Sequence, residues 1–385
     1  MFDDFDDELL DEDDEVSASK GEGLQPPRLM SDCLGHEAVE KNLLELAESG
    51  RMPHALIFAG PQGIGKATMA FRLARYLLKK GREDESAGGG LFGETLPKTV
   101  PENFHVAPDD PVFRQVASGG HPGLITVERL YDEKNDRLKA TVEVDEARRI
   151  TPFMRMTASQ DSWRIVIVDD ADTMNRNAQN AILKILEEPP ANAILILVAH
   201  RIGAMLPTIR SRCRVIDFTT PDRKNFASIV GRDHGNLPER EMNLLYDISC
   251  GSIGQAVRLC NEGALETIEK VMALLHGWPR WQWSRIHMLA ETMGRKGGED
   301  GLRSFQDVFL WIVNSLLRAK ARGEALKGPL ANEAAQKLLS HYTLNEWTEI
   351  AGHLAEHFDT VTTASLDRRH AVLGAFSVFE AREAA

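Results

Sequence analysis

The residues best suited to chemistry form a glycine-rich loop, Gly60–Thr68, with the sequence Gly-Pro-Gln-Gly-Ile-Gly-Lys-Ala-Thr. An apolar run precedes it, and a helical pattern follows from Ala67 to about Leu78. A loop between a strand and a helix directs backbone N–H groups at phosphate oxygens, and the helix N-terminus adds partial positive charge. A chance match in a tight turn is the alternative. The predicted nucleotide contacts are Gly60, Gly63, Gly65, Lys66 and Thr68.

The position after the lysine decides whether such a loop can hold a metal. A Ser or Thr there ligates Mg²⁺ through its hydroxyl, and here the residue is Ala67. Thr68 is no simple replacement, because one position along a helix rotates a side chain by roughly 100°. The loop therefore predicts a P-loop fold more strongly than it predicts ATP hydrolysis.

Two carboxylates, Asp169 and Asp170, end the apolar run Arg164–Val168. A strand-terminal carboxylate near a P-loop can hold Mg²⁺, the Walker B role, which we assign to Asp169. Asp170 lies where related motors place a water-activating Glu, and it is one methylene shorter, which weakens the case for a general base. The alternative is a pair of aspartates that only end the strand at the sheet edge.

A third candidate is Arg212, which lies in the run Arg210–Arg214 with three arginines. A cluster of arginines is ordinarily a solvated surface. An arginine on a loop beside a nucleotide-binding fold can instead act in trans, by stabilising charge on the γ-phosphate of a neighbouring subunit. Arg212 is therefore the candidate catalytic residue, and its role requires no ATP in its own pocket.

The elements that position these residues alternate between apolar strands and helices. Continuous apolar runs, among them Ile194–Ala199 and Arg214–Phe218, predict a parallel sheet covered by helices on both faces. The alternating runs Leu124–Glu128 and Leu138–Val144 predict a β-hairpin or a strand with an elaborated edge, and a helix is predicted to start near Asn175. We expect an acidic tail (1–27), a P-loop domain (28–219) with a loop-rich insertion (79–122), a domain of three short helices (220–262) and an all-helical domain (263–385).

The charge of the chain is concentrated at its start. Ten of the first fifteen residues are acidic and none is basic, so only −3 of the net charge of −13 belongs to the remainder. We expect this tail to be disordered and solvated; a nucleic-acid mimic or a partner tether is the alternative. A signal peptide and a membrane-spanning run are both lacking, which predicts a cytoplasmic protein. The four cysteines show no C-x-x-C spacing, so we predict no metal site.

The run Asn180–Pro190 (Asn-Ala-Ile-Leu-Lys-Ile-Leu-Glu-Glu-Pro-Pro), together with Ile194–His200 and Pro207–Cys213, resembles bacterial clamp-loader subunits of the AAA+ class. The resemblance covers about residues 29–262 and extends to the helical C-terminus by architecture only. It implies an α/β AAA+ domain with a parallel sheet, then a small helical lid domain and an all-α collar domain that joins subunits into a ring.

Two branches of this family share the motifs, the gamma/tau ATPase motors and the delta' subunits. Three departures favour the delta' branch: Ala67 after the P-loop lysine, His200 at about the sensor 1 position, and Gly254 where a motor has its sensor 2 arginine. The pair His121-Pro122 also resembles delta' sequences. Many members carry a cysteine-rich zinc module after the P-loop helix, whereas residues 79–122 contain no cysteine.

The delta' resemblance implies a subunit of the DNA polymerase III clamp loader, with gamma/tau motor subunits and a delta subunit as partners. Through the complex it would act on the sliding clamp and primed DNA, and Arg212 would enter the ATP site of a motor subunit. It implies no independent polymerase or ATPase activity and no required cofactor, with ATP and Mg²⁺ possible in a degenerate pocket. The alternative is an active gamma/tau-like ATPase that uses Lys66, Asp169 and Asp170. A small-molecule kinase is disfavoured, because residues 222–385 are helical without evident lid chemistry.

Overall fold

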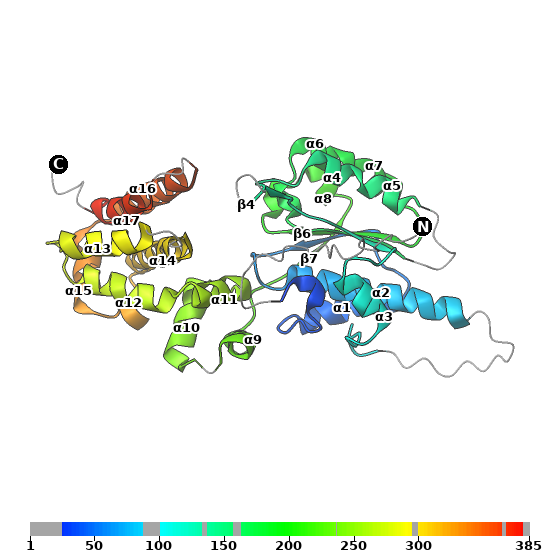
Figure 1. Cartoon of the computed structure of the whole chain (residues 1–385), viewed down its shortest axis with the longest axis horizontal. Coiled ribbons are helices and arrows are strands. Elements are labelled where there is room, and N and C mark those ends of the chain that lie inside the picture. Colours follow the sequence, from blue (N-terminus) through cyan, green and yellow to red (C-terminus); the bar gives the residue numbers. More distant parts are fainter. Residues whose placement is uncertain are drawn as a thin grey trace, which may run out of the picture.

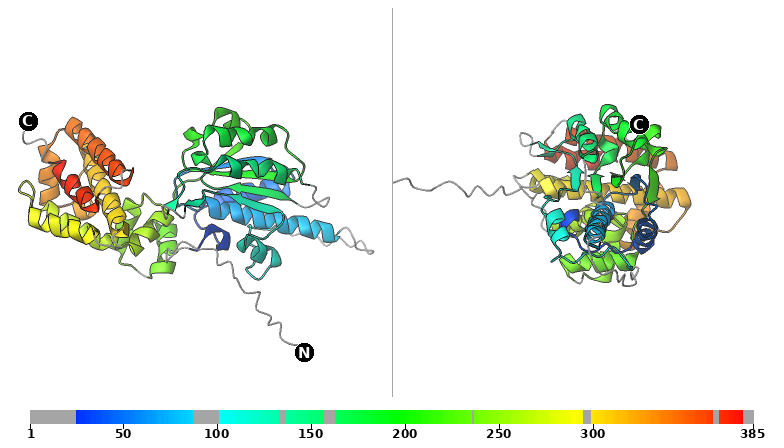
Figure 2. Two further views of the ribbon diagram at one scale, coloured as in Figure 1. Left: turned by 45° about the horizontal axis from the view of Figure 1, so that its top comes forward. Right: turned by 90° about the vertical axis from the view of Figure 1, so that its right-hand side faces the viewer.

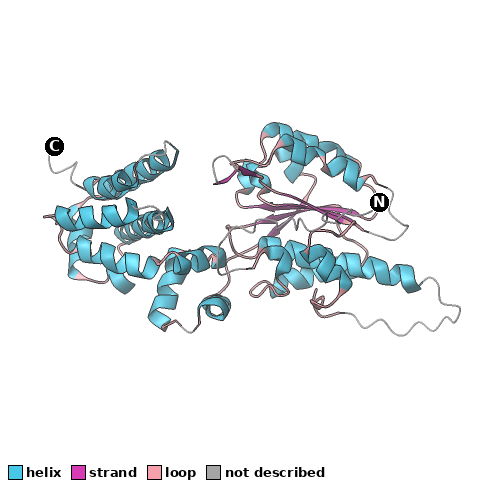
Figure 3. Ribbon diagram, in the orientation of Figure 1, coloured by secondary structure: helices cyan, strands magenta, loops and turns pink. Residues whose placement is uncertain are grey.

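The computed structural model describes residues 25–87, 101–132, 137–156, 163–235, 237–294, 299–363 and 367–379. The acidic residues of the predicted tail lie outside these ranges. Figures 1 and 3 show a part that contains the sheet and, beside it along the longest axis, a part made of helices. Within the described residues, no helix combines the length and apolarity needed to span a membrane.

Five parallel strands form the main sheet in the order β2-β5-β6-β1-β7. Their bounds are β1 Ala55–Ala59, β2 Leu124–Val127, β5 Arg164–Val168, β6 Ala193–Ala199 and β7 Arg214–Asp217. Ala59 at the end of β1 pairs with Ala199 of β6 and with Asp217 of β7. The carboxyl ends of these strands therefore meet at one edge of the sheet, and the predicted parallel α/β fold is confirmed.

Helices cover both faces of the sheet (Figures 1 and 2). Along β1, Leu56 and Phe58 belong to one buried cluster, and Ala55, Ile57 and Ala59 to the other. The first face is covered by α1 (Glu37–Glu48), α2 (Lys66–Ala87) and α3 (Pro111–Ala117). The second face is covered by α4 (Val144–Arg148), α5 (Ile150–Met154), α6 (Arg176–Ala181), α7 (Leu183–Glu187) and α8 (Pro207–Arg210).

Helix α2 is longer than the periodicity predicts, since it extends to Ala87 instead of ending near residue 78. The first residues of the segment 79–122, predicted as loop-rich, are therefore helical. Two non-local ion pairs support this extension: Lys79 Nζ lies 2.9 Å from Asp110, and Lys80 Nζ lies 2.8 Å from Glu48.

The predicted hairpin of residues 124–128 with residues 138–144 is wrong, because Leu124–Val127 pairs parallel with β5 as the edge strand β2 of the main sheet. This fits the alternative, a strand with an elaborated edge. A short hairpin follows β2. It consists of β3 (Tyr131–Asp132) and β4 (Arg137–Leu138), which pair antiparallel. The chain then enters α4 at Val144, so the alternating pattern after Leu138 does not continue as a strand.

The remaining helices share one continuous buried cluster that runs from Phe226 to Phe379. The three helices predicted between residues 222 and 262 are present, and their core is continuous with that of the later helices. The bounds are α9 Arg223–His234, α10 Glu239–Ile248, α11 Ile253–Asn261, α12 Ala264–Leu275, α13 Trp283–Gly294, α14 Glu299–Arg322, α15 Glu333–His341, α16 Leu344–Thr363 and α17 Arg368–Ser377. Short 3-10 helices are η1 Pro27–Leu29, η2 Ala171–Thr173, η3 Ile202–Ala204 and η4 Gly328–Leu330.

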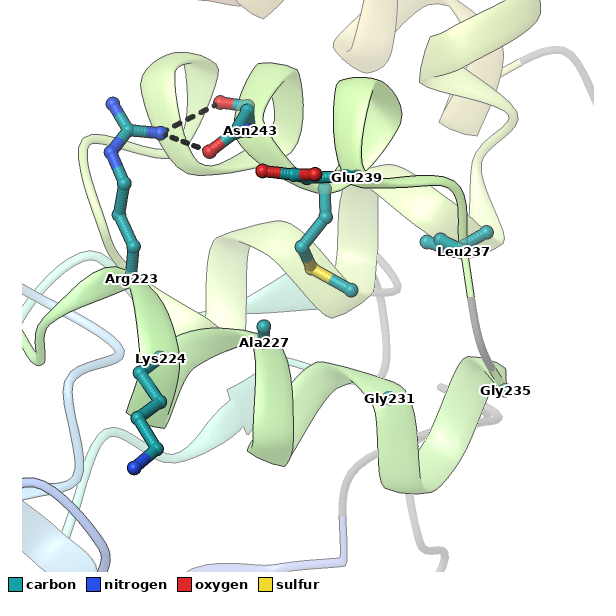
Figure 4. Close-up of a pocket in the computed structure, with 9 residues that line it drawn as sticks. Arg223, Lys224, Ala227, Gly231, Gly235, Leu237, Glu239 and Asn243 are labelled. Atoms are coloured by element: carbon teal, nitrogen blue, oxygen red, sulfur yellow. Dashed lines mark hydrogen bonds between the residues drawn. The ribbon is translucent and has the colours of Figure 1, made fainter.

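A groove of about 440 Å³ lies between α9 and α10 (Figure 4). Its Arg223 guanidinium already donates to Asn243 Oδ1 at 2.8 Å and to Asp247 Oδ1 at 2.6 Å. The groove contains none of the predicted site residues, which gather at the sheet instead.

Candidate functional site

The glycine-rich loop connects the carboxyl end of β1 to α2, as predicted. Gly60 and Gly63 have φ values of +153° and +72°, and a Cβ on Gly60 would lie 2.4 Å from the backbone oxygen of Phe218. Glycine is therefore required at both positions. His36 fixes the loop from outside, because its Nε2 donates to the carbonyl of Ile64 at 2.6 Å. The backbone has the form of a P-loop.

Lys66 is only 3% exposed, and its ammonium contacts three acceptors within the protein. Nζ donates to the carbonyl of Gly60 at 2.7 Å, to the carbonyl of Pro61 and to Nδ1 of His200 at 2.9 Å. A lysine ammonium has three N–H donors, so the protein itself uses the whole set. Burial lowers the pKa of Lys66 to about 8, although nearby carboxylates, first that of Asp169, oppose the shift.

His200 connects Lys66 to Asp170. Because Nδ1 accepts from Lys66, Nε2 carries the proton and donates to Asp170 Oδ1 at 2.6 Å. The other carboxylate oxygen of Asp170 accepts from Arg129 Nε at 2.6 Å. The backbone N–H of His200 donates to Asp172 at 2.8 Å, which fixes the position of the imidazole. A continuous hydrogen-bonded chain thus runs through Lys66, His200, Asp170 and Arg129.

The two predicted carboxylates differ in their electrostatics. Burial raises the pKa of Asp169 to about 6, and the neighbouring charge of Asp170 adds to the rise. Burial also acts to raise the pKa of Asp170, but hydrogen bonds from His200 and the charge of Arg129 hold it below its ordinary value. Asp170 is thus an ionised carboxylate with both oxygens engaged, which leaves it poorly placed to activate water.

The start of α11 lies directly on the phosphate loop. The backbone N–H of Gly254 donates to the carbonyl of Gly63 at 2.9 Å. A Cβ on Gly63 would lie 2.5 Å from Ser252 Oγ, and one on Gly254 would lie 3.2 Å from Gly63 Cα. At the position where the resemblance places a sensor 2 arginine, this chain therefore has a close contact between two backbones.

Arg212 lies near the amino ends of the strands, opposite to the carboxyl ends where the phosphate loop lies. It precedes β7, whose first residue Arg214 pairs with Leu56 near the start of β1, whereas the phosphate loop follows Ala59 at the end of β1. Since strands rise about 3.3 Å per residue, roughly 10 Å or more of sheet separates Arg212 from the loop. Cys213 next to it is buried in the core, and burial raises its thiol pKa to about 12.

A family model described as "DNA polymerase III, delta subunit" matches residues 35–222, the region that contains the loop, both carboxylates and Arg212. These residues belong to the DNA polymerase III delta' subunit family. The chain is similar to the DNA polymerase III subunit delta' of Pseudomonas aeruginosa, with 29% identity over 228 residues, which cover 59% of this chain and 62% of that protein. It therefore spans less than two thirds of that relative.

The chain is also similar to the DNA polymerase III subunit delta' of Escherichia coli K12, at 28% identity over 269 residues, which cover 66% of this chain and 72% of that protein. Among solved structures, a gamma subunit-related protein of Thermotoga maritima aligns with 90% of this chain and 99% of its own, with 19% identity and a TM-score of 0.40.

The structure brings together most of the predicted pocket residues, namely Gly60, Gly63, Gly65, Lys66, Asp169 and Asp170. Thr68 lies one position beyond Ala67 in the first turn of α2, and Arg212 lies apart from the pocket. Sequence reasoning missed Arg129, Asp172 and Ser252. Only Asp172 had a recognisable signal, as the third carboxylate of the run Asp169–Asp172. The described residues contain no cluster of His, Cys, Asp and Glu suited to a metal.

Asp169→Asn should stabilise the protein at alkaline pH. The folded-state pKa of Asp169, about 6, is above that of an unfolded aspartate, so its contribution to stability is complete below about pH 4 and is lost as pH rises through about 6. We expect the variant to exceed wild type in free energy of unfolding by about 1–2 kcal/mol at pH 8, with a smaller difference at pH 5. Urea denaturation at both pH values measures this.

Asp170→Asn is the matched control for this substitution, because its pKa is shifted in the opposite direction. We expect it to lower stability at pH 8, since the charged form accepts from His200 and Arg129. A variant Asp169→Asn that is less stable than wild type at pH 8 would contradict the assignment.

Proposed function

We propose that this chain is the delta'-type subunit of a cytoplasmic DNA polymerase III clamp loader. In this proposal its partners are gamma/tau motor subunits and a delta subunit, and the complex opens the sliding clamp and places it on primed DNA. The chain contributes an arginine to the ATP site of an adjacent motor and does not hydrolyse ATP itself. Membership of residues 35–222 in the delta' family supports the assignment as a delta'-type clamp-loader subunit.

The observation that carries the proposed arginine role is the location of Arg212 at the sheet edge opposite its own phosphate loop. There its guanidinium contacts Thr208, Ser211 and Glu187, which belong to α8, the turn after α8 and α7, and not the phosphate loop. A side chain that is 37% exposed remains accessible to a neighbouring subunit. Arginines supplied in trans stabilise the charge that develops on a transferred phosphoryl group, and this is the role we assign to Arg212.

The residues of the loop do not fit a Mg²⁺–nucleotide complex in the arrangement described. Lys66 would have to break an existing hydrogen bond to contact a phosphate, and Ala67 offers no ligand to the metal. Asp170 is engaged by His200 and Arg129. We propose that the chain requires no nucleotide or metal cofactor, and that its loop serves as a scaffold on which α11 rests.

An active gamma/tau-like ATPase is the competing function, and the intact loop backbone with Lys66 and Asp169 favours it. Measuring ATP binding and turnover by the purified chain separates the two. We expect no steady turnover by wild type and no change on Lys66→Ala, because the ammonium is already satisfied by the protein. Steady hydrolysis that disappears in Lys66→Ala would overturn the proposal. Co-purification of this chain with motor and delta subunits checks the proposed partners.

A further inference from the structure

Two different elements hold the guanidinium of Arg212. Nη1 donates to the carbonyl of Thr208 in α8 at 3.0 Å and lies 3.4 Å from Ser211 Oγ. Nη2 lies 3.1 Å from Oε1 of Glu187, the last residue of α7. The side chains of Arg212 and Glu187 are 37% and 52% exposed. The arginine is thus held at the surface by a carbonyl on one nitrogen and a carboxylate on the other.

This arrangement leaves part of the guanidinium available. An arginine has five N–H donors, and the hydrogen bonds above use those of Nη1, while Nη2 is paired with Glu187 by charge. Nε and Nη2 make no hydrogen bond with the described part of the chain, so they can still donate to a phosphate oxygen. Glu187 therefore fixes the side chain without using all of its donors.

We propose that Glu187 is a positioning residue that holds Arg212 ready to donate to the phosphates of an adjacent subunit; this inference rests on the proposed role of Arg212. A free arginine side chain samples many rotamers, and fixing it on binding costs entropy. An arginine that is already held by Thr208 and Glu187 loses less conformational entropy when it binds the phosphates of the adjacent subunit. Glu187 thereby lowers the barrier to phosphoryl transfer without touching the nucleotide.

The adjacent Glu188 provides a matched control. It belongs to the same run, is 72% exposed on its side chain, and lies 3.5 Å from Arg155 instead of Arg212. Replacing either glutamate removes one exposed carboxylate from the end of α7, but only the loss of Glu187 releases Arg212.

The test uses a clamp loader reconstituted with motor and delta subunits, with ATPase measured in the presence of clamp and primed DNA. We expect Glu187→Ala to lower kcat about two- to fivefold, the scale of an exposed ion pair, while KM for ATP stays within about twofold. Glu187→Gln should lower kcat to a similar extent, because the contact is an ion pair and the amide carries no charge. Glu188→Ala should match wild type.

A double-substitution cycle separates positioning from a general structural role. In an Arg212→Ala background, Glu187→Ala should cause no further loss, because there is no guanidinium left to hold. An equal loss in that background, or wild-type kcat in Glu187→Ala alone, overturns the positioning role. If Arg212→Ala itself leaves the ATPase unchanged, the proposed function fails first; if it lowers the ATPase while Glu187→Ala does not, only this inference fails.

Discussion

Replacing Arg212 with alanine is expected to lower the ATPase of the reconstituted loader by about 10³-fold, the scale associated with loss of an arginine supplied in trans. The physical reason is that a fixed positive charge stabilises the charge that develops on the transferred phosphoryl group. The substitution should not affect folding, because Arg212 is exposed and its contacts are with Thr208, Ser211 and Glu187 at the surface. Steady-state ATPase with clamp and primed DNA measures the effect.

Arg210→Ala is the control for this experiment. Arg210 is the last residue of α8, is exposed, and lies two positions from Arg212 in the same arginine-rich run. We expect its loss to change the ATPase by less than about twofold, since surface charges away from the reacting phosphate contribute little. Size-exclusion chromatography of both variants confirms that the loader assembles. An assembled Arg212→Ala loader with wild-type ATPase would exclude the trans role.

Gly254→Arg is expected to detach α11 from the phosphate loop. The new Cβ would lie 3.2 Å from Gly63 Cα and 3.6 Å from the Gly63 oxygen, and backbone atoms cannot move aside as a flexible side chain can. Overpacking of this kind costs about 1–3 kcal/mol. Loss of the hydrogen bond from Gly254 N–H to Gly63 costs about 1 kcal/mol more. Urea denaturation measures the change, and limited proteolysis of the connection before α9 reports whether the helical part has separated from the sheet.

Gly352→Arg is the matched substitution at a helical glycine with free space. Gly352 lies in α16 and is exposed, and a Cβ added to it would meet no atom within 4 Å. Since both variants replace a glycine in a helix by the same residue, their difference isolates the contact with Gly63. We expect Gly352→Arg to stabilise the protein by up to about 1 kcal/mol, because glycine is unfavourable inside a helix and arginine is not. Equal free energies of unfolding for the two variants would show that the contact between α11 and the phosphate loop does not stabilise the protein.

Much of the fold follows from local pattern. The continuous apolar run of β5 and the glycines of the loop predict a buried strand and a P-loop, because strand burial and positive φ are properties of short segments. Asn175 caps α6 by accepting from the backbone of Ala178 at 2.9 Å, again a local effect. The extension of α2 was not predictable in this way, since its supporting ion pairs join residues distant in the chain.

Local sequence is enough to specify the backbone of the phosphate loop, the loss of the hydroxyl at Ala67 and the presence of Lys66. It does not specify whether the ammonium of Lys66 is free to contact a phosphate. His200, 134 positions away, accepts from it, and Gly254 rests on the loop; both contacts depend on strand order and helix docking. The same holds for Arg212, because only the direction of β7 relative to β1 places it at the far edge of the sheet. Pairings between distant segments are set by packing of the whole chain, and no local pattern encodes them.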